Sequence, residues 1–157
     1  MALEREPKNF YALFGLADCY RGMNQQFKSV LYWNKILEID PDNKVILTRA
    51  GDAYRTTGNY EEAKKYYNKA LEIQFDIYAA IGLALIYKGE GNNEEATKRF
   101  ENLIKSDSKN FRLYIDLADR YVAMKQKDKA IKVLNDYLKF DNRNLSVKIA
   151  LDKVNKI

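Results

Sequence analysis

Four tyrosines recur along the chain at intervals of 34, 33 and 34 residues, and this period constrains the fold more than any other feature. They are Tyr20, Tyr54, Tyr87 and Tyr121. A small residue follows each tyrosine nine positions later, and a large apolar residue follows four positions after that. The two columns are Ser29, Ala63, Ala96, Ala130 and Trp33, Tyr67, Phe100, Leu134. Such a period indicates stacked supersecondary repeats, and we expect the tyrosines to occupy equivalent seams between helices.

Each repeat is predicted to form two antiparallel helices, A and B. Its apolar residues recur at steps of three and four, which is the period of an amphipathic helix. Gly58 and Gly91 stand where helix A should end, because glycine accepts the left-handed conformation of a helix C-terminus. Asn59 and Asn92 follow as N-caps of helix B, each with a glutamate three residues later. In the first and fourth repeats the glycine position holds Asn24 and Lys125. The lysine turn should be strained by about 1 kcal/mol or adopt another geometry.

Residues 50–73 show the pattern in its most complete form, with the sequence AGDAYRTTGNYEEAKKYYNKALEI. Together with the junction Asp40-Pro41, they resemble the tetratricopeptide repeat family, and the resemblance extends over nearly the whole chain. It implies a single all-α domain, a right-handed superhelical α-solenoid of antiparallel helix pairs. The predicted parts are a remnant of a preceding repeat (1–9), four repeats (10–43, 44–76, 77–110 and 111–144) and a capping helix (145–157). In the capping helix, Leu145, Ile149 and Leu151 are expected to continue the register of helix A. Because Ala2 to Pro7 match the end of a helix B, we expect this chain to be a piece of a longer array.

The resemblance further implies that the A helices line a concave groove. The candidate groove residues lie beside the core stripe of each helix A, at steps of three and four. Their aromatic, apolar and charged side chains suit an extended or helical peptide, and their aspartates favour basic or amide groups on it. The alternative is that these side chains only cover the helix packing or contact an adjoining repeat. The candidates are Tyr11, Phe14, Asp18, Val45, Thr48, Asp52, Arg55, Tyr78, Ile81, Leu85, Arg112, Ile115 and Asp119. Among them, Phe14, Ile81 and Ile115 have no evident partner within their own repeat.

We therefore expect a protein–protein interaction scaffold that binds a peptide or partner protein and uses no cofactor. Some members of the family bind the C-terminal carboxylates of chaperones through lysines, asparagines and an arginine. The corresponding positions here are Phe14, Asp18, Arg49, Tyr78 and Gly82, or, one repeat further on, Thr48, Asp52, Gly82, Arg112 and Asp116. Because aspartates repel a carboxylate, a chaperone tail is not the expected partner.

The composition argues against catalysis. The chain has no histidine, which removes the commonest general base and metal ligand. Its single cysteine, Cys19, is predicted to be an inert thiol in the packed part of a helix. There is no glycine-rich phosphate loop and no nucleophile motif. No apolar stretch is long enough for a membrane span and no signal peptide is evident, so the expected location is the cytoplasm.

Three other functions stay open at this stage. The net charge of +5 invites nucleic-acid binding, but the basic excess lies in residues 121–157 and not along the predicted groove. Exposed repeat ends, including Leu3, Leu13 and Leu16, could support a homo-oligomer. The repeats could also regulate a larger protein or recruit its substrate.

Overall fold

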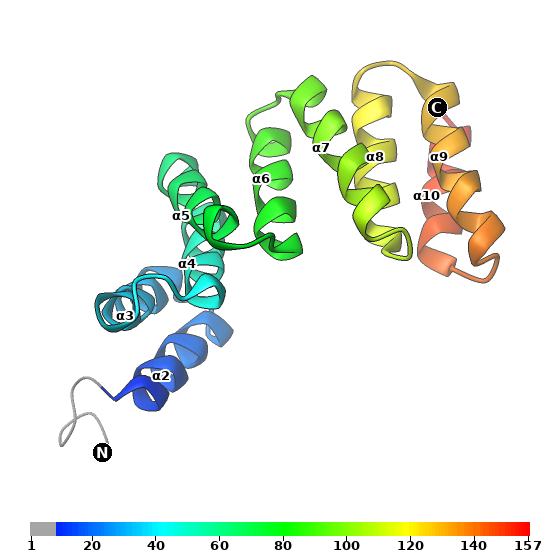
Figure 1. Ribbon diagram of the computed structural model, residues 1–157. Coiled ribbons are helices and arrows are strands. Elements are labelled where there is room, and N and C mark those ends of the chain that lie inside the picture. Colours follow the sequence, from blue (N-terminus) through cyan, green and yellow to red (C-terminus); the bar gives the residue numbers. More distant parts are fainter. Residues whose placement is uncertain (1–8) are drawn as a thin grey trace. The chain divides into compact units, whose positions relative to one another are not determined.

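The computed structural model describes residues 9–157, which form nine α-helices and no strand (Figure 1). In chain order these are α2 (Phe10–Gly22), α3 (Gln26–Ile39), α4 (Lys44–Thr56), α5 (Tyr60–Ile73), α6 (Ile77–Gly89), α7 (Asn93–Ser106), α8 (Phe111–Ala123), α9 (Lys127–Phe140) and α10 (Leu145–Asn155). The even-numbered helices α2 to α8 are the A helices of four repeats, and α3 to α9 are their B helices. Helix α10 follows them, while residues 1–8 of the predicted remnant lie outside the described residues.

The predicted turns between helices A and B are confirmed. Gly58 and Gly91 have φ angles of 80° and 74°, and Asn24 and Lys125 have φ angles of 58° and 59°. The fourth turn thus keeps the left-handed geometry in spite of its lysine. Asn59 and Asn92, which follow the two glycines, cap helix B as expected, because their side-chain oxygens accept backbone N–H groups. These bonds join Glu62 N to Asn59 Oδ1 (3.4 Å) and Glu95 N to Asn92 Oδ1 (3.2 Å).

The repeated columns form the core. Every residue in the small column and in the large apolar column is completely buried. The tyrosine column lies half-buried at the seam between helices A and B. The first three tyrosines contact the side chain twelve residues further on, in helix B. The contacts are Tyr20 with Tyr32 (ring centroids 5.5 Å apart), Tyr54 with Tyr66 (5.2 Å), and the Tyr87 ring with the Arg99 guanidinium (4.6 Å). The equivalence predicted from the period therefore holds for these three repeats.

The helices fall into two compact units, one ending at Ile86 and the other beginning at Tyr87. In the first unit, one core cluster surrounds Trp33 between α2, α3 and α4, and another surrounds Tyr67 between α4, α5 and α6. In the second unit, a cluster around Leu134 joins α8, α9 and α10. Each unit therefore has a hydrophobic core of its own.

Two expectations about buried residues are wrong. Cys19 is exposed, because it lies on the face of α2 opposite the buried Leu13 and Ala17. In α10, the residues expected to continue the core register include Leu145 and Ile149, yet their exposed fractions are 69% and 48%. The side of α10 that packs on α8 and α9 carries Val147 and Val154 instead.

Candidate functional site

The first compact unit contains a hollow between α4 and the beginning of α6, with a volume of about 400 Å³. We call it the α4–α6 hollow. Because residues three and four apart share a helix face, α4 contributes several neighbouring side chains to one wall. The lining residues are Val45, Thr48, Arg49, Asp52, Asp76 and Tyr78. Four of these are candidate groove residues, and the structure adds Arg49 and Asp76.

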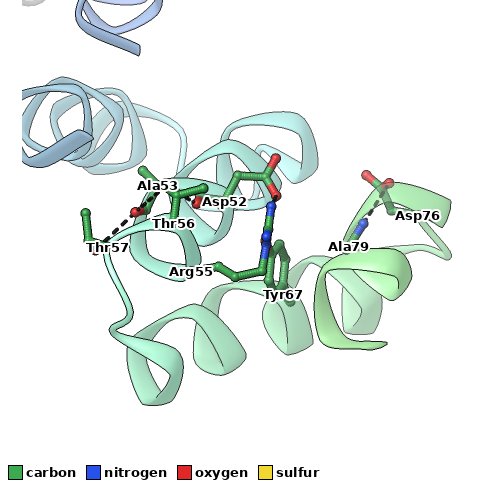
Figure 2. A network of polar contacts seen from close by, with 8 residues as sticks. All are labelled: Asp52, Ala53, Arg55, Thr56, Thr57, Tyr67, Asp76 and Ala79. Atoms are coloured by element: carbon green, nitrogen blue, oxygen red, sulfur yellow. Dashed lines mark hydrogen bonds and ion pairs between the residues drawn. The ribbon is translucent and has the colours of Figure 1, made fainter. Parts of the chain in front are cut away.

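Asp76 holds the two sides of the α4–α6 hollow together. Its Oδ1 atom accepts hydrogen bonds from the backbone N–H groups of Tyr78 (2.9 Å) and Ala79 (3.4 Å), so it caps the N-terminus of α6. Figure 2 shows the bond to Ala79. Its Oδ2 atom accepts a hydrogen bond from the Thr48 hydroxyl of α4 at 3.2 Å. Thr48 is buried although it lines the hollow, and this bond gives its hydroxyl a partner.

Asp52 belongs to a polar network with Tyr67 and Arg55 (Figure 2). The Tyr67 hydroxyl donates to Asp52 Oδ1 at 2.6 Å, and Arg55 Nε donates to the Tyr67 oxygen at 3.2 Å. The Arg55 guanidinium lies 3.8 Å from the same Oδ1 atom. Burial raises the pKa of Asp52 above its usual 3.8, and the opposing effects of Tyr67 and Arg55 do not cancel this. Burial and the Asp52 carboxylate also raise the pKa of Tyr67 above its usual value.

Two glycines allow Tyr67 to reach this network from α5. A Cβ atom at Gly82 would lie 2.3 Å from Tyr67 Cζ, and one at Gly51 would lie 2.7 Å from Tyr67 Cδ1. Since neither atom exists, the ring fits between α4 and α6 and its hydroxyl meets Asp52. The repeat pattern assigned Tyr67 only to the core. The sequence contains one signal of a polar role. Tyr67 carries a hydroxyl, whereas the other residues of its column, Trp33, Phe100 and Leu134, do not.

In the first repeat, the equivalent aspartate is paired with arginines. Asp18 Oδ1 lies 2.9 Å from Arg21 Nη2 and 3.4 Å from Arg49 Nη1. The Arg49 guanidinium lies 5.3 Å from the ring centre of Phe14 and 5.6 Å from that of Trp33. Phe14 and Trp33 also contact each other, with ring centroids 5.3 Å apart. The expectation that Phe14 lacks a partner in its own repeat is therefore wrong.

The other candidate residues differ in exposure. In the first unit, Tyr11 is exposed, whereas Ile81 and Leu85 are half-buried. In the second unit, Arg112 and Asp119 are exposed. Ile115 packs against the core cluster of α8, α9 and α10, so it too has partners in its own repeat, contrary to expectation.

No group of three or more His, Cys, Asp or Glu side chains within residues 9–157 is placed to hold a metal ion. In the same part of the chain, no helix has the length and apolar character that crossing a membrane requires.

Three family models, each described as a tetratricopeptide repeat, match residues 11–43, 46–77 and 87–152. Together they cover most of the chain, which belongs to the tetratricopeptide repeat family. Proteins of this family are in general scaffolds for protein interaction. None of the curated proteins matches the sequence.

Solved structures share the fold over nearly the whole chain. A tetratricopeptide repeat protein from Parabacteroides merdae ATCC 43184 is 25% identical with a TM-score of 0.80, over 98% of this chain and 60% of that one. PilW, a widely conserved type IV pilus biogenesis factor, is 19% identical with a TM-score of 0.83, over 99% and 73%. MamA from Desulfovibrio magneticus RS-1 is 15% identical with a TM-score of 0.79, over 93% and 83%. The present chain thus spans 60% of the length of the first of these proteins.

Proposed function

We propose that this protein is a scaffold that binds a peptide segment of a partner protein on its A helices, with the α4–α6 hollow as the principal contact. One observation carries the proposal. Val45, Thr48, Asp52 and Tyr78, which come from the A helices of two successive repeats, line one hollow of about 400 Å³. A hollow of this size accommodates one or two side chains of an extended or helical peptide.

The exposure of the lining residues supports the same function. Tyr78 and Val45 are 72% and 52% exposed, so a ligand can cover apolar surface that the fold leaves in water. A tyrosine provides a large contact area with few rotatable bonds, which is why such residues often dominate the affinity of an interface. The polar groups of Asp52 and Asp76 would then determine the orientation of the ligand.

The test begins with a random dodecapeptide library displayed on phage and selected against the complete chain. Replacing Tyr78 with alanine removes the exposed ring from the α4–α6 hollow. We expect the selected peptides to bind Tyr78→Ala at least about tenfold more weakly, as measured by isothermal titration calorimetry.

Phe27→Ala is the matched control, because Phe27 is an aromatic residue of α3 that is 78% exposed and does not line this hollow. Both variants should keep the circular dichroism spectrum of the original chain. The proposal fails if the library yields no binder, or if its binders are equally sensitive to the two substitutions.

A further inference from the structure

The structure offers an internal comparison between two equivalent aspartates. Asp18 and Asp52 each lie two residues before the tyrosine of their repeat. Asp18 is paired with Arg49, which comes from helix A of the following repeat and lies five residues before Tyr54. The equivalent position for Asp52, five residues before Tyr87, is Gly82. The repeat that follows Asp52 therefore provides no cation at the position from which Arg49 pairs with Asp18.

Part of the Asp52 carboxylate remains available to a ligand. The contacts of Asp52 with Tyr67 and Arg55 both involve Oδ1. Tyr67 occupies the space beside Gly82 but contributes only a neutral hydroxyl. The side chain of Asp52 is 44% exposed, and it lines the α4–α6 hollow. A ligand can therefore reach this carboxylate through Oδ2.

The charges around Asp52 favour an additional cation. Arg55 and Arg49 lower its pKa and Asp76 raises it, yet the sum of burial and all neighbours still leaves the pKa above the usual value. The ionised carboxylate is thus incompletely compensated by its own protein. Arg49 also lines the hollow, but its guanidinium is already held by Asp18 and by the rings of Phe14 and Trp33.

We propose that the α4–α6 hollow binds an arginine side chain of the partner peptide, whose guanidinium pairs with Asp52 as Arg49 pairs with Asp18. This inference rests on the function proposed above. A guanidinium is favoured because it is planar and combines carboxylate pairing with contacts to aromatic rings, as Arg49 does in the first repeat. In the hollow, Tyr78 and Val45 provide the apolar lining and Asp76 provides a second carboxylate.

The probe is N-acetyl-arginine amide, added to the complete ¹⁵N-labelled chain and followed by NMR. We expect saturable shifts of the backbone amide signals of Thr48, Asp52 and Tyr78. The citrulline analogue has nearly the same shape but no charge, and it should bind at least about tenfold more weakly. The lysine analogue should also bind more weakly, because its ammonium cannot form the two parallel hydrogen bonds of a guanidinium.

Asp52→Asn should weaken binding of the arginine probe at least about tenfold, because it removes the charge while an acceptor for Tyr67 remains. Asp119→Asn is the matched control, since Asp119 is the exposed equivalent aspartate of the fourth repeat and does not line the hollow, and it should leave the affinity unchanged. The inference is wrong if the citrulline probe or the lysine probe binds as tightly as the arginine probe. It is also wrong if both variants lose the same affinity for the arginine probe.

The two proposals can fail separately. If the phage library yields peptides that depend on Tyr78 but ignore Asp52, the scaffold function stands and the arginine site is wrong. If no peptide binds but the arginine probe still shifts the three amide signals, the scaffold function in its proposed form is wrong.

Discussion

At the scale of single residues, Asp52 and Tyr67 show how one hydroxyl changes the role of a repeat position. In the same column, Phe100 and Leu134 fill the core and have no polar atom on their side chains. Tyr67 is equally buried, but its hydroxyl donates to Asp52 and keeps that carboxylate at the edge of the α4–α6 hollow. A core residue thus orients a side chain proposed to contact the ligand.

The raised pKa of Asp52 predicts how the stability of Asp52→Asn depends on pH. The folded chain holds this proton more tightly than the unfolded chain, whose aspartate pKa is about 3.8. The resulting stability is fully present below that value and is lost as pH rises through the higher folded pKa. Asp52→Asn should therefore gain stability relative to the original chain between pH 3 and pH 7, as measured by urea unfolding.

Asp136→Asn provides a comparison of opposite sign. Hydrogen bonds from Lys132 and Lys139 lower the pKa of Asp136, so its contribution to stability is present above 3.8 and is lost as pH falls. This variant should lose stability relative to the original chain as pH rises over the same range. If stability changes in the same direction for both variants, the assignment with the opposite predicted sign is wrong.

At the scale of the helices, the packing of α4, α5 and α6 depends on two glycines that leave space for a neighbouring aromatic ring. Gly51 and Gly82 make room for the Tyr67 ring, whereas Gly15 has no neighbouring atom within 4 Å of its would-be Cβ. Gly15 occupies the same repeat position as Gly82, five residues before the tyrosine. Equivalent glycines in one chain therefore face different constraints.

This contrast predicts opposite effects of the same substitution. Gly82→Ala places a methyl group 2.3 Å from Tyr67 Cζ and should lower the free energy of unfolding by about 1–3 kcal/mol. Gly15→Ala adds a methyl group in open space on α2 and should raise it by up to about 1 kcal/mol, because alanine is the better helix former. Guanidinium chloride titrations of both variants test the prediction. Stabilisation of Gly82→Ala would show that Tyr67 does not need this space.

At the scale of the whole molecule, each compact unit has its own hydrophobic core, as expected for an array in which a repeat contacts its neighbours. Local damage should then have a local effect. Leu134 is completely buried in the cluster of α8, α9 and α10. Its replacement by alanine should cost about 2–5 kcal/mol of packing energy in that unit.

Hydrogen exchange can follow this effect along the chain. In Leu134→Ala, we expect amide protection to fall in α8, α9 and α10, while α2 to α5 exchange at the rate of the original chain. Ile131→Ala is a milder comparison, since Ile131 is only half-buried against the same cluster. A uniform loss of protection over all helices would show that the chain opens as one cooperative body.

The sequence by itself determined the repeat architecture, because the signals for it are local and periodic. Helix A ends just before Gly58 and Gly91, because each glycine accepts the left-handed conformation of the turn by itself. The buried columns follow from the 3.6-residue period of a helix combined with the 33- or 34-residue period of the repeats. Predicting these features requires no knowledge of which repeats contact each other.

Only the tertiary structure decided which polar side chains meet, because these contacts join residues about thirty positions apart. Arg49 reaches Asp18 across the boundary between repeats, and Asp76, which caps α6, accepts a hydrogen bond from Thr48 of α4. The spacing alone reveals neither pairing. The route of Tyr67 past Gly51 and Gly82 depends on the distance between three helices. Periodicity indicates which face of a helix points inward. The charges and the free space beside that face depend on the side chains that the next repeat places there.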